Sequence, residues 1–112
     1  MSLLARLKAD LGAARKDGDA ERVAVVRTLM AAIANAEAVE LGPSHPTDVQ
    51  GWAEVPRRRL SAEDVRDVVR READELRAAA AEYERRGAPQ EAARLRRSAD
   101  CAEEYLAGRQ PA

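Results

Sequence analysis

The sequence predicts an all-α fold with four principal helices. They form two helical hairpins, and a long irregular loop joins the hairpins. Apolar residues recur at three- and four-residue steps in four separate windows, which is the period of an amphipathic helix. Alanine occupies 25 of the 112 positions and phenylalanine is absent, so strong helix formers dominate and strand formers are scarce. The large apolar residues are few enough to suggest disorder, but disorder also needs a large net charge, and here the net charge is −1.

The first helix is expected over residues 3–16. Ser2 is its expected N-cap, because a serine hydroxyl accepts a hydrogen bond from a free amide of the first turn. A polar turn follows, in which Gly18 is free to adopt a positive φ. The predicted apolar face consists of Leu4, Leu7, Leu11 and Ala14.

The second helix is expected to begin after Asp19, a good capping residue, and to continue to about residue 40. Its predicted apolar face consists of Val23, Val26, Met30 and Ile33 and, one turn on, Glu37 and Leu41. Residues 42–60 are predicted to form an irregular loop, because a Gly-Pro pair and further prolines cannot continue the helix.

A capping-box-like sequence, in which Ser61 is followed by Asp64 in place of the usual glutamate, predicts a third helix. This helix should end at Arg86, with Gly87 in the left-handed conformation after it. Its predicted apolar face consists of Val65, Val68, Val69, Leu76, Ala80 and Tyr83. Pro89 suits the first turn of a fourth helix. That helix is predicted to bury Ala92, Leu95, Ala99, Ala102 and Leu106.

Residue types that carry enzyme chemistry are scarce. His45 and Cys101 are the only histidine and cysteine and fall in different elements, so neither a metal site nor a disulfide is predicted. No glycine-rich phosphate-binding motif is present, and no cofactor is expected. Carboxylates such as Glu63 and Asp67 alternate with arginines, as on a salt-bridged, solvated helix face. The residues themselves therefore indicate no catalytic group.

Two charged residues do not fit a solvated face. Glu72 falls in the middle of the apolar face of the third helix, and Arg27 falls at the edge of the apolar face of the second. A buried charge is costly unless it is paired. We predict a shielded Arg27–Glu72 ion pair that aligns the two helices; a functional polar cleft or plain exposure are the alternatives.

A run of three arginines, Arg57, Arg58 and Arg59, precedes the third helix and could contact phosphate groups. Trp52 is the only aromatic residue nearby, and nucleic-acid sites usually combine basic residues with several aromatic ones. Only weak RNA contact is therefore predicted for this run.

The sequence has no apolar run long enough to span a membrane and no secretory signal pattern, so a cytoplasmic protein without membrane contact is expected. A single cysteine fits a reducing compartment. An alanine-rich core buries little area, so a protein partner or a second copy is expected to add stability.

Several short segments of the sequence are together fairly specific for one protein family because of their order and spacing, although no single segment is diagnostic. They are residues 3–11 with Asp10, 14–17, 22–27, 32–35, 65–69, 71–72, Arg77, 80–83 up to Gly87, and Glu104-Tyr105-Leu106. In this order they resemble the N-terminal part of the GatB/YqeY family. The short stand-alone members of that family are similar to the C-terminal region of the B subunit of tRNA-dependent amidotransferases. The sequence departs from the family in residues 88–91, in the length of the 42–60 loop, and after Leu106.

The resemblance implies one YqeY-like helical domain over residues 1–112, acting as a non-catalytic module that docks a protein or a tRNA-amidation complex. The family's second small helical domain is expected to be absent, since the chain stops six residues after Leu106. The family label is carbon–nitrogen ligase with glutamine as amido donor. A component with that activity only when assembled is therefore one alternative, and a self-associating regulatory domain is another.

We expect the chain alone to bind tRNA weakly, with a Kd of roughly 10⁻⁴–10⁻⁶ M at physiological salt, which is the non-specific range. Only Arg57–Arg59, together with Lys8, Arg15 and Lys16, form basic patches that neighbouring acids do not compensate. Fluorescence anisotropy at two salt concentrations, with the Arg57–Arg59 triple alanine variant alongside, measures this affinity. Nanomolar binding at physiological salt would contradict the expectation.

Overall fold

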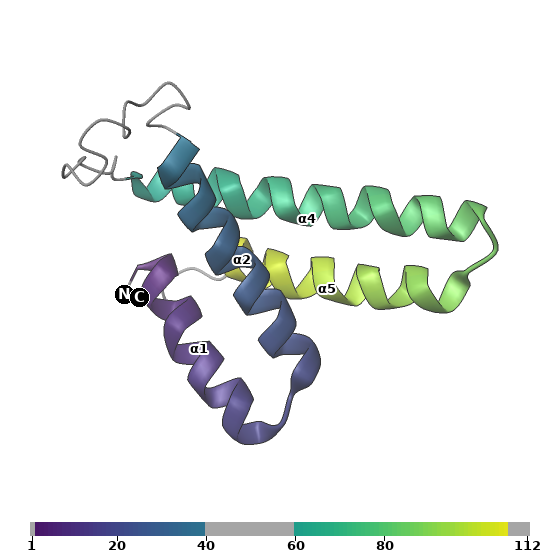
Figure 1. Cartoon of the computed structure of the whole chain (residues 1–112), viewed down its shortest axis with the longest axis horizontal. Coiled ribbons are helices and arrows are strands. Elements are labelled where there is room, and N and C mark those ends of the chain that lie inside the picture. The colour runs from purple at the N-terminus through teal and green to yellow at the C-terminus, as the bar shows by residue number, and fades with distance from the viewer. Residues whose placement is uncertain (1, 40–59, 108–112) are drawn as a thin grey trace, which may run out of the picture.

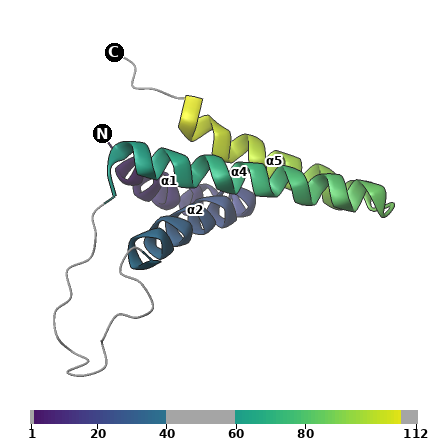
Figure 2. The same cartoon turned by 90° about the horizontal axis from the view of Figure 1, so that it is seen from above.

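The computed structural model describes residues 2–39 and 60–107 of the chain. These residues form four helices and no strand: α1 (Leu3–Asp17), α2 (Ala20–Val39), α4 (Ala62–Arg85) and α5 (Pro89–Ala107). Helices α1 and α2 make one hairpin, α4 and α5 make the other, and α2 crosses the second hairpin near the α5 C-terminal half (Figure 1; Figure 2). The predicted all-α fold is confirmed. The predicted loop over residues 42–60 lies outside the described residues, apart from Leu60.

The N-terminal caps form as the sequence predicts. The Ser2 hydroxyl accepts a hydrogen bond from an amide of the first turn of α1 at 3.0 Å, and the Asp19 carboxylate accepts one at the start of α2 at 3.1 Å. At the start of α4, the Ser61 hydroxyl and the Asp64 carboxylate each accept a hydrogen bond from the other's backbone amide, at 3.0 and 3.1 Å. Aspartate thus completes this capping box in place of glutamate.

Both hairpin turns depend on a glycine. Gly18 has φ 71° and Gly87 has φ 79°, the left-handed region in which a side chain is strained. Gly18 follows α1 directly, and its amide donates back to carbonyls of the last turn, so the chain reverses with the helix end satisfied.

The main core lies where the two hairpins cross. Its buried members come from all four helices: Leu7, Val25, Val26, Leu29, Ile33, Val68, Val69, Ala73, Ala102 and Tyr105. Beyond the crossing, the α4–α5 hairpin projects past α1 and α2 (Figure 1). The core of this projecting part is small and consists of Ala80, Ala92 and Leu95, with Leu76 and Ala79 against them.

Alanine is the main buried residue type between α4 and α5. Ala73, Ala80, Ala92, Ala99 and Ala102 are all at most 1% exposed. The distance between packed helices depends on the side chains at the contact, so these small residues allow the two backbones to lie close together. The buried alanines thus allow a short distance between the axes of α4 and α5.

The structure corrects the predicted apolar face of α2. Val26 and Ile33 are buried as expected, but Val25 and Leu29 are also buried, whereas Val23 and Met30 are only half-buried. Nearly every side of α2 carries Ala, Val, Leu, Met or Ile, so its periodicity does not define one face. Packing on α4 and α5 selects the face.

One tyrosine lies outside the core where the sequence predicts burial, and the other is buried without having been predicted. Tyr83, expected in the apolar face of α4, is 40% exposed. It lies in the last turn of α4, in the part of the hairpin that projects past α1 and α2 (Figure 1). Tyr105 is 1% exposed, whereas Leu106, the residue predicted to be buried, is only half-buried.

Substituting Leu29 and Met30 by alanine in turn distinguishes the observed face of α2 from the predicted one. We expect Leu29→Ala to lower the free energy of unfolding by about 2–5 kcal/mol, because it leaves a cavity at the hairpin crossing, and Met30→Ala to cost less than half as much. Urea denaturation of both variants measures the difference. A larger loss for Met30→Ala would restore the face predicted from the sequence.

Candidate functional site

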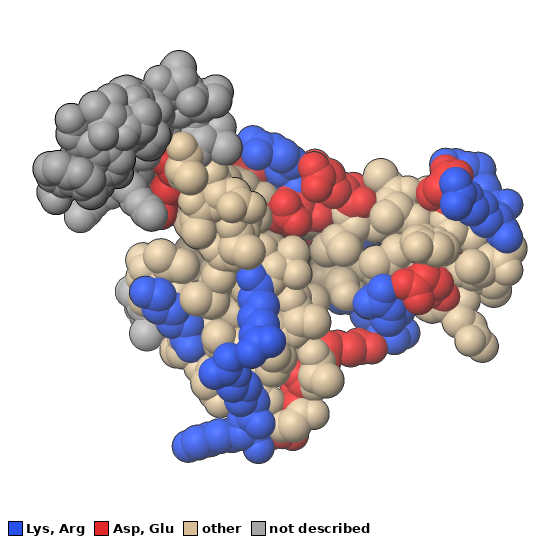
Figure 3. Space-filling model, viewed as in Figure 1, with Lys and Arg blue, Asp and Glu red and all other residues tan. Residues whose placement is uncertain are grey.

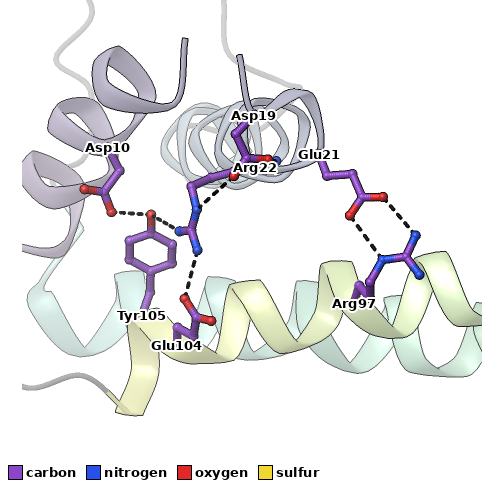
Figure 4. A network of polar contacts seen from close by, with 7 residues as sticks. All are labelled: Asp10, Asp19, Glu21, Arg22, Arg97, Glu104 and Tyr105. Carbon is purple, nitrogen blue, oxygen red and sulfur yellow. Dashed lines mark hydrogen bonds and ion pairs between the residues drawn. The ribbon is translucent and has the colours of Figure 1, made fainter. Parts of the chain in front are cut away.

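A network of polar side chains joins α1, α2 and α5 at the edge of the core (Figure 4). The Tyr105 hydroxyl donates a hydrogen bond to the Asp10 carboxylate and accepts one from Arg22 Nη1 at 3.4 Å. Arg22 Nη2 also pairs with Glu104 Oε1 at 3.1 Å. We call these four residues, Asp10, Arg22, Glu104 and Tyr105, the polar junction.

Two further arginines strengthen the contact around the polar junction. The Arg6 guanidinium lies 4.9 Å from the centroid of the Tyr105 ring, within cation–π range. Arg97 on α5 binds Glu21 on α2 with two parallel N–H···O bonds of 2.9 and 3.2 Å. Such a bidentate pair constrains the relative orientation of the two side chains, so it helps to orient α2 against α5.

The pKa values of Tyr105 and Arg22 are both raised, so the phenol stays protonated and the guanidinium stays charged near neutral pH. Burial, together with the hydrogen bond to Asp10, raises the pKa of the Tyr105 phenol. The hydrogen bond to Glu104 raises the pKa of Arg22. Burial raises the pKa of the nearby Cys101 thiol as well, so this cysteine stays protonated and is a poor nucleophile. The arrangement holds α1, α2 and α5 together at the edge of the core.

The predicted Arg27–Glu72 ion pair is not formed within the described residues. Arg27 is exposed, and it borders a depression formed by α1 and α2. Glu72 is half-buried beside the α2–α4 contact, where burial, followed by the neighbouring Glu75, raises the pKa of its carboxyl while Arg71 opposes the shift. The reason for the error is the orientation of α2: burying Val25 and Leu29 turns Arg27 away from α4.

Other predicted residues are distributed as follows. Arg57, Arg58 and Arg59 lie outside the described residues, as does His45. Cys101 is half-buried on α5. In the described part of the chain, no group of three His, Cys, Asp or Glu residues is placed to hold a metal ion. None of the described helices has an apolar stretch long enough to cross a membrane.

The charged side chains of the α1–α2 hairpin include an engaged group and an unpaired group. Asp10 and Arg22 belong to the polar junction, Glu21 binds Arg97, and Arg6 lies over the Tyr105 ring, so these four side chains contact α5. Four cations of the hairpin have no partner in the described structure: Lys8, Arg15, Lys16 and Arg27. We call these four residues the cationic face, and Figure 3 shows Lys and Arg side chains gathered over α1 and α2.

All four residues of the cationic face are exposed. None makes an ion pair or a hydrogen bond of its side chain in the described structure. By contrast, most arginines of α4 and α5 are engaged, for example Arg77 with Asp100 and Glu103 at 3.0 and 2.9 Å. The cationic face is therefore a part of the described surface where several cations lie without an ion pair.

Two members of the cationic face border a shallow depression between α1 and α2. Arg15 and Arg27 flank it, and the volume is about 350 Å³. The other lining residues are small or apolar: Ala14, Gly18, Ala20, Val23 and Ala24. The sequence indicated Lys8, Arg15 and Lys16 as uncompensated cations but did not indicate Arg27, which was assigned to a buried pair.

Comparison of the chain with protein-family models, with curated proteins and with solved structures finds no match. The resemblance to the GatB/YqeY family therefore stays a prediction.

Replacing Tyr105 by phenylalanine tests the polar junction. We expect Tyr105→Phe to lower the free energy of unfolding by roughly 1–3 kcal/mol at pH 7, because the Asp10 carboxylate loses its donor in a half-buried position. The raised pKa of Tyr105 makes the contribution of its hydroxyl complete below the unfolded-state pKa of about 10, and it declines as the pH rises toward the folded-state pKa. The difference between the wild type and the variant should therefore shrink above about pH 10.

Urea denaturation at pH 7 and at about pH 10.5 measures both effects. Tyr83→Phe is the matched control, since Tyr83 is 40% exposed. Removal of the Tyr83 hydroxyl should change the free energy of unfolding by less than about 0.5 kcal/mol. Equal losses for the two variants, or a difference that does not change with pH, would contradict the assigned role of Tyr105.

Proposed function

We propose that this chain is a non-catalytic helical module that docks a protein partner, in the tRNA-amidation setting that its resemblance to the GatB/YqeY family implies. The observation that carries the proposal is the group of unpaired cations on the α1–α2 hairpin. Asp10 and Glu21 are engaged by residues of α5, whereas Lys8, Arg15, Lys16 and Arg27 are exposed and make no ion pair in the described structure.

Exposed and unpaired cations cost the free molecule little, since water solvates them fully. They gain free energy only when a partner supplies carboxylate or phosphate groups at matching positions. Unpaired surface cations therefore favour a docking role. The cationic face belongs to the α1–α2 hairpin, which the polar junction holds against α5.

The pKa shifts of Tyr105 and Cys101 support docking over catalysis by the polar junction. A general acid or base works best with a pKa near the operating pH, but burial moves the pKa values of Tyr105 and Cys101 further from neutrality. The junction thus provides mechanical support for the α1–α2 hairpin.

Calorimetric titration of the chain with the purified tRNA-dependent amidotransferase of the same organism tests the proposal. We expect association with a Kd of about 10⁻⁶ M or tighter, which corresponds to about 8 kcal/mol of binding free energy. We also expect that the chain alone, supplied with glutamine, ATP and misacylated tRNA, forms no amide.

Two outcomes would overturn the proposal separately. Amide formation by the isolated chain would show that it is an enzyme. A lack of any association with the amidotransferase would remove the tRNA-amidation setting.

A further inference from the structure

We infer that the cationic face binds an acidic amphipathic helix of a partner protein, which inserts an apolar side chain between α1 and α2. This inference rests on the proposed docking function and names its surface and the chemistry of its partner. Carboxylates of the incoming helix would pair with Arg15 and Arg27 at the two sides of the depression.

The shape and lining of the depression favour an apolar side chain. Its volume is about 350 Å³, and between the arginines it is lined by Ala14, Ala20, Val23 and Ala24. A helix inserts its apolar residues into such grooves at three- and four-residue steps. The outer side of α2 continues with exposed small residues, Ala31, Ala34 and Ala38, so a second helix is not held away by bulky side chains.

The charge pattern determines the sign of the partner. Arg15 and Arg27 lie on neighbouring helices at one depression, and Lys8 lies two helical turns before Arg15 on α1. Guanidinium groups bind carboxylates with two parallel hydrogen bonds. A helix with acidic residues flanking its apolar positions matches this arrangement, and a basic or neutral helix leaves the cations unpaired.

A nucleic acid fits this surface less well. Proteins that bind single-stranded RNA combine basic residues with aromatic side chains on which bases stack. In the described structure, Tyr105 is buried in the polar junction and Tyr83 lies in the last turn of α4, and neither tyrosine lines the depression. Alanine and valine there offer nothing to a base edge or a phosphate.

A second copy of the chain also fits less well. Six carboxylates on α4 and α5 are already engaged by arginines of the same chain: Asp67, Glu82, Glu84, Glu91, Asp100 and Glu103. The exposed Glu63, Asp74 and Glu75 on α4 make no ion pair in the described structure, so a homodimer through these residues is one outcome of the test below.

Selection from a displayed library of helical peptides with randomised faces tests the inference on the full chain. We expect the enriched peptides to carry net negative charge and apolar residues at three- and four-residue spacing. Arg27→Glu should weaken their binding about tenfold or more, because it replaces attraction by repulsion at the depression. The matched control is Arg71→Glu, which makes the same charge change at another exposed arginine without an ion pair, on α4, and it should change binding less than about twofold.

Circular dichroism and urea denaturation confirm that both variants fold, which is expected because both arginines are exposed. Four results would overturn the inference: enrichment of neutral or basic peptides, equal losses for Arg27→Glu and Arg71→Glu, nanomolar tRNA binding that displaces the peptides at physiological salt, or a homodimer that Arg27→Glu dissociates. If the amidotransferase binds Arg27→Glu as well as the wild type, the docking function stands and its assignment to this face fails. If it binds neither protein, the proposed function itself fails.

Discussion

A phenol is expensive to bury unless its hydroxyl finds a hydrogen-bond partner, and the arrangement of α1, α2 and α5 depends on meeting this requirement for Tyr105. Its ring fills the core at the hairpin crossing, while its hydroxyl reaches Asp10 on α1 and Arg22 on α2. A single side chain near the C-terminal end of α5 thereby determines where both helices of the other hairpin lie. Arg22 also pairs with Glu104, which ties α2 to α5 a second time.

The charge pattern of the surface follows from this arrangement. Because Tyr105 and Arg97 require acceptors on the α1–α2 hairpin, the carboxylates Asp10 and Glu21 lie on the side that contacts α5. Arg6 and Arg22 also contact α5, whereas Lys8, Arg15, Lys16 and Arg27 are exposed and no ion pair neutralises them in the described structure. The protein has a net charge of only −1, yet one face is distinctly positive. Net charge alone is thus a poor guide to what this surface attracts.

The α4–α5 hairpin illustrates a different compromise. Alanines let its helices lie close together, but each buries little apolar area. Ion pairs across the hairpin, such as Arg77 with Asp100 and Arg96 with Glu84, are exposed and contribute little individually. The part that projects beyond α1 and α2 has a core of only a few residues. It therefore depends on helix propensity and on the Gly87 turn more than the crossing region does.

The sequence by itself determined the helical class, the caps at Ser2, Asp19 and Ser61, and the turns at Gly18 and Gly87, because these depend on interactions within a few residues. It did not determine which side of α2 is buried, since that helix is apolar on most sides, and the assignments of Met30 and of the Arg27–Glu72 pair failed for this reason. Nor does local spacing show that Asp10, Arg22 and Tyr105 meet, because they are distant in the chain. The packing of one hairpin on the other decided both the buried side of α2 and the meeting of these three residues. It buries apolar surface of α2 and at the same time gives the Tyr105 hydroxyl its hydrogen-bond partners.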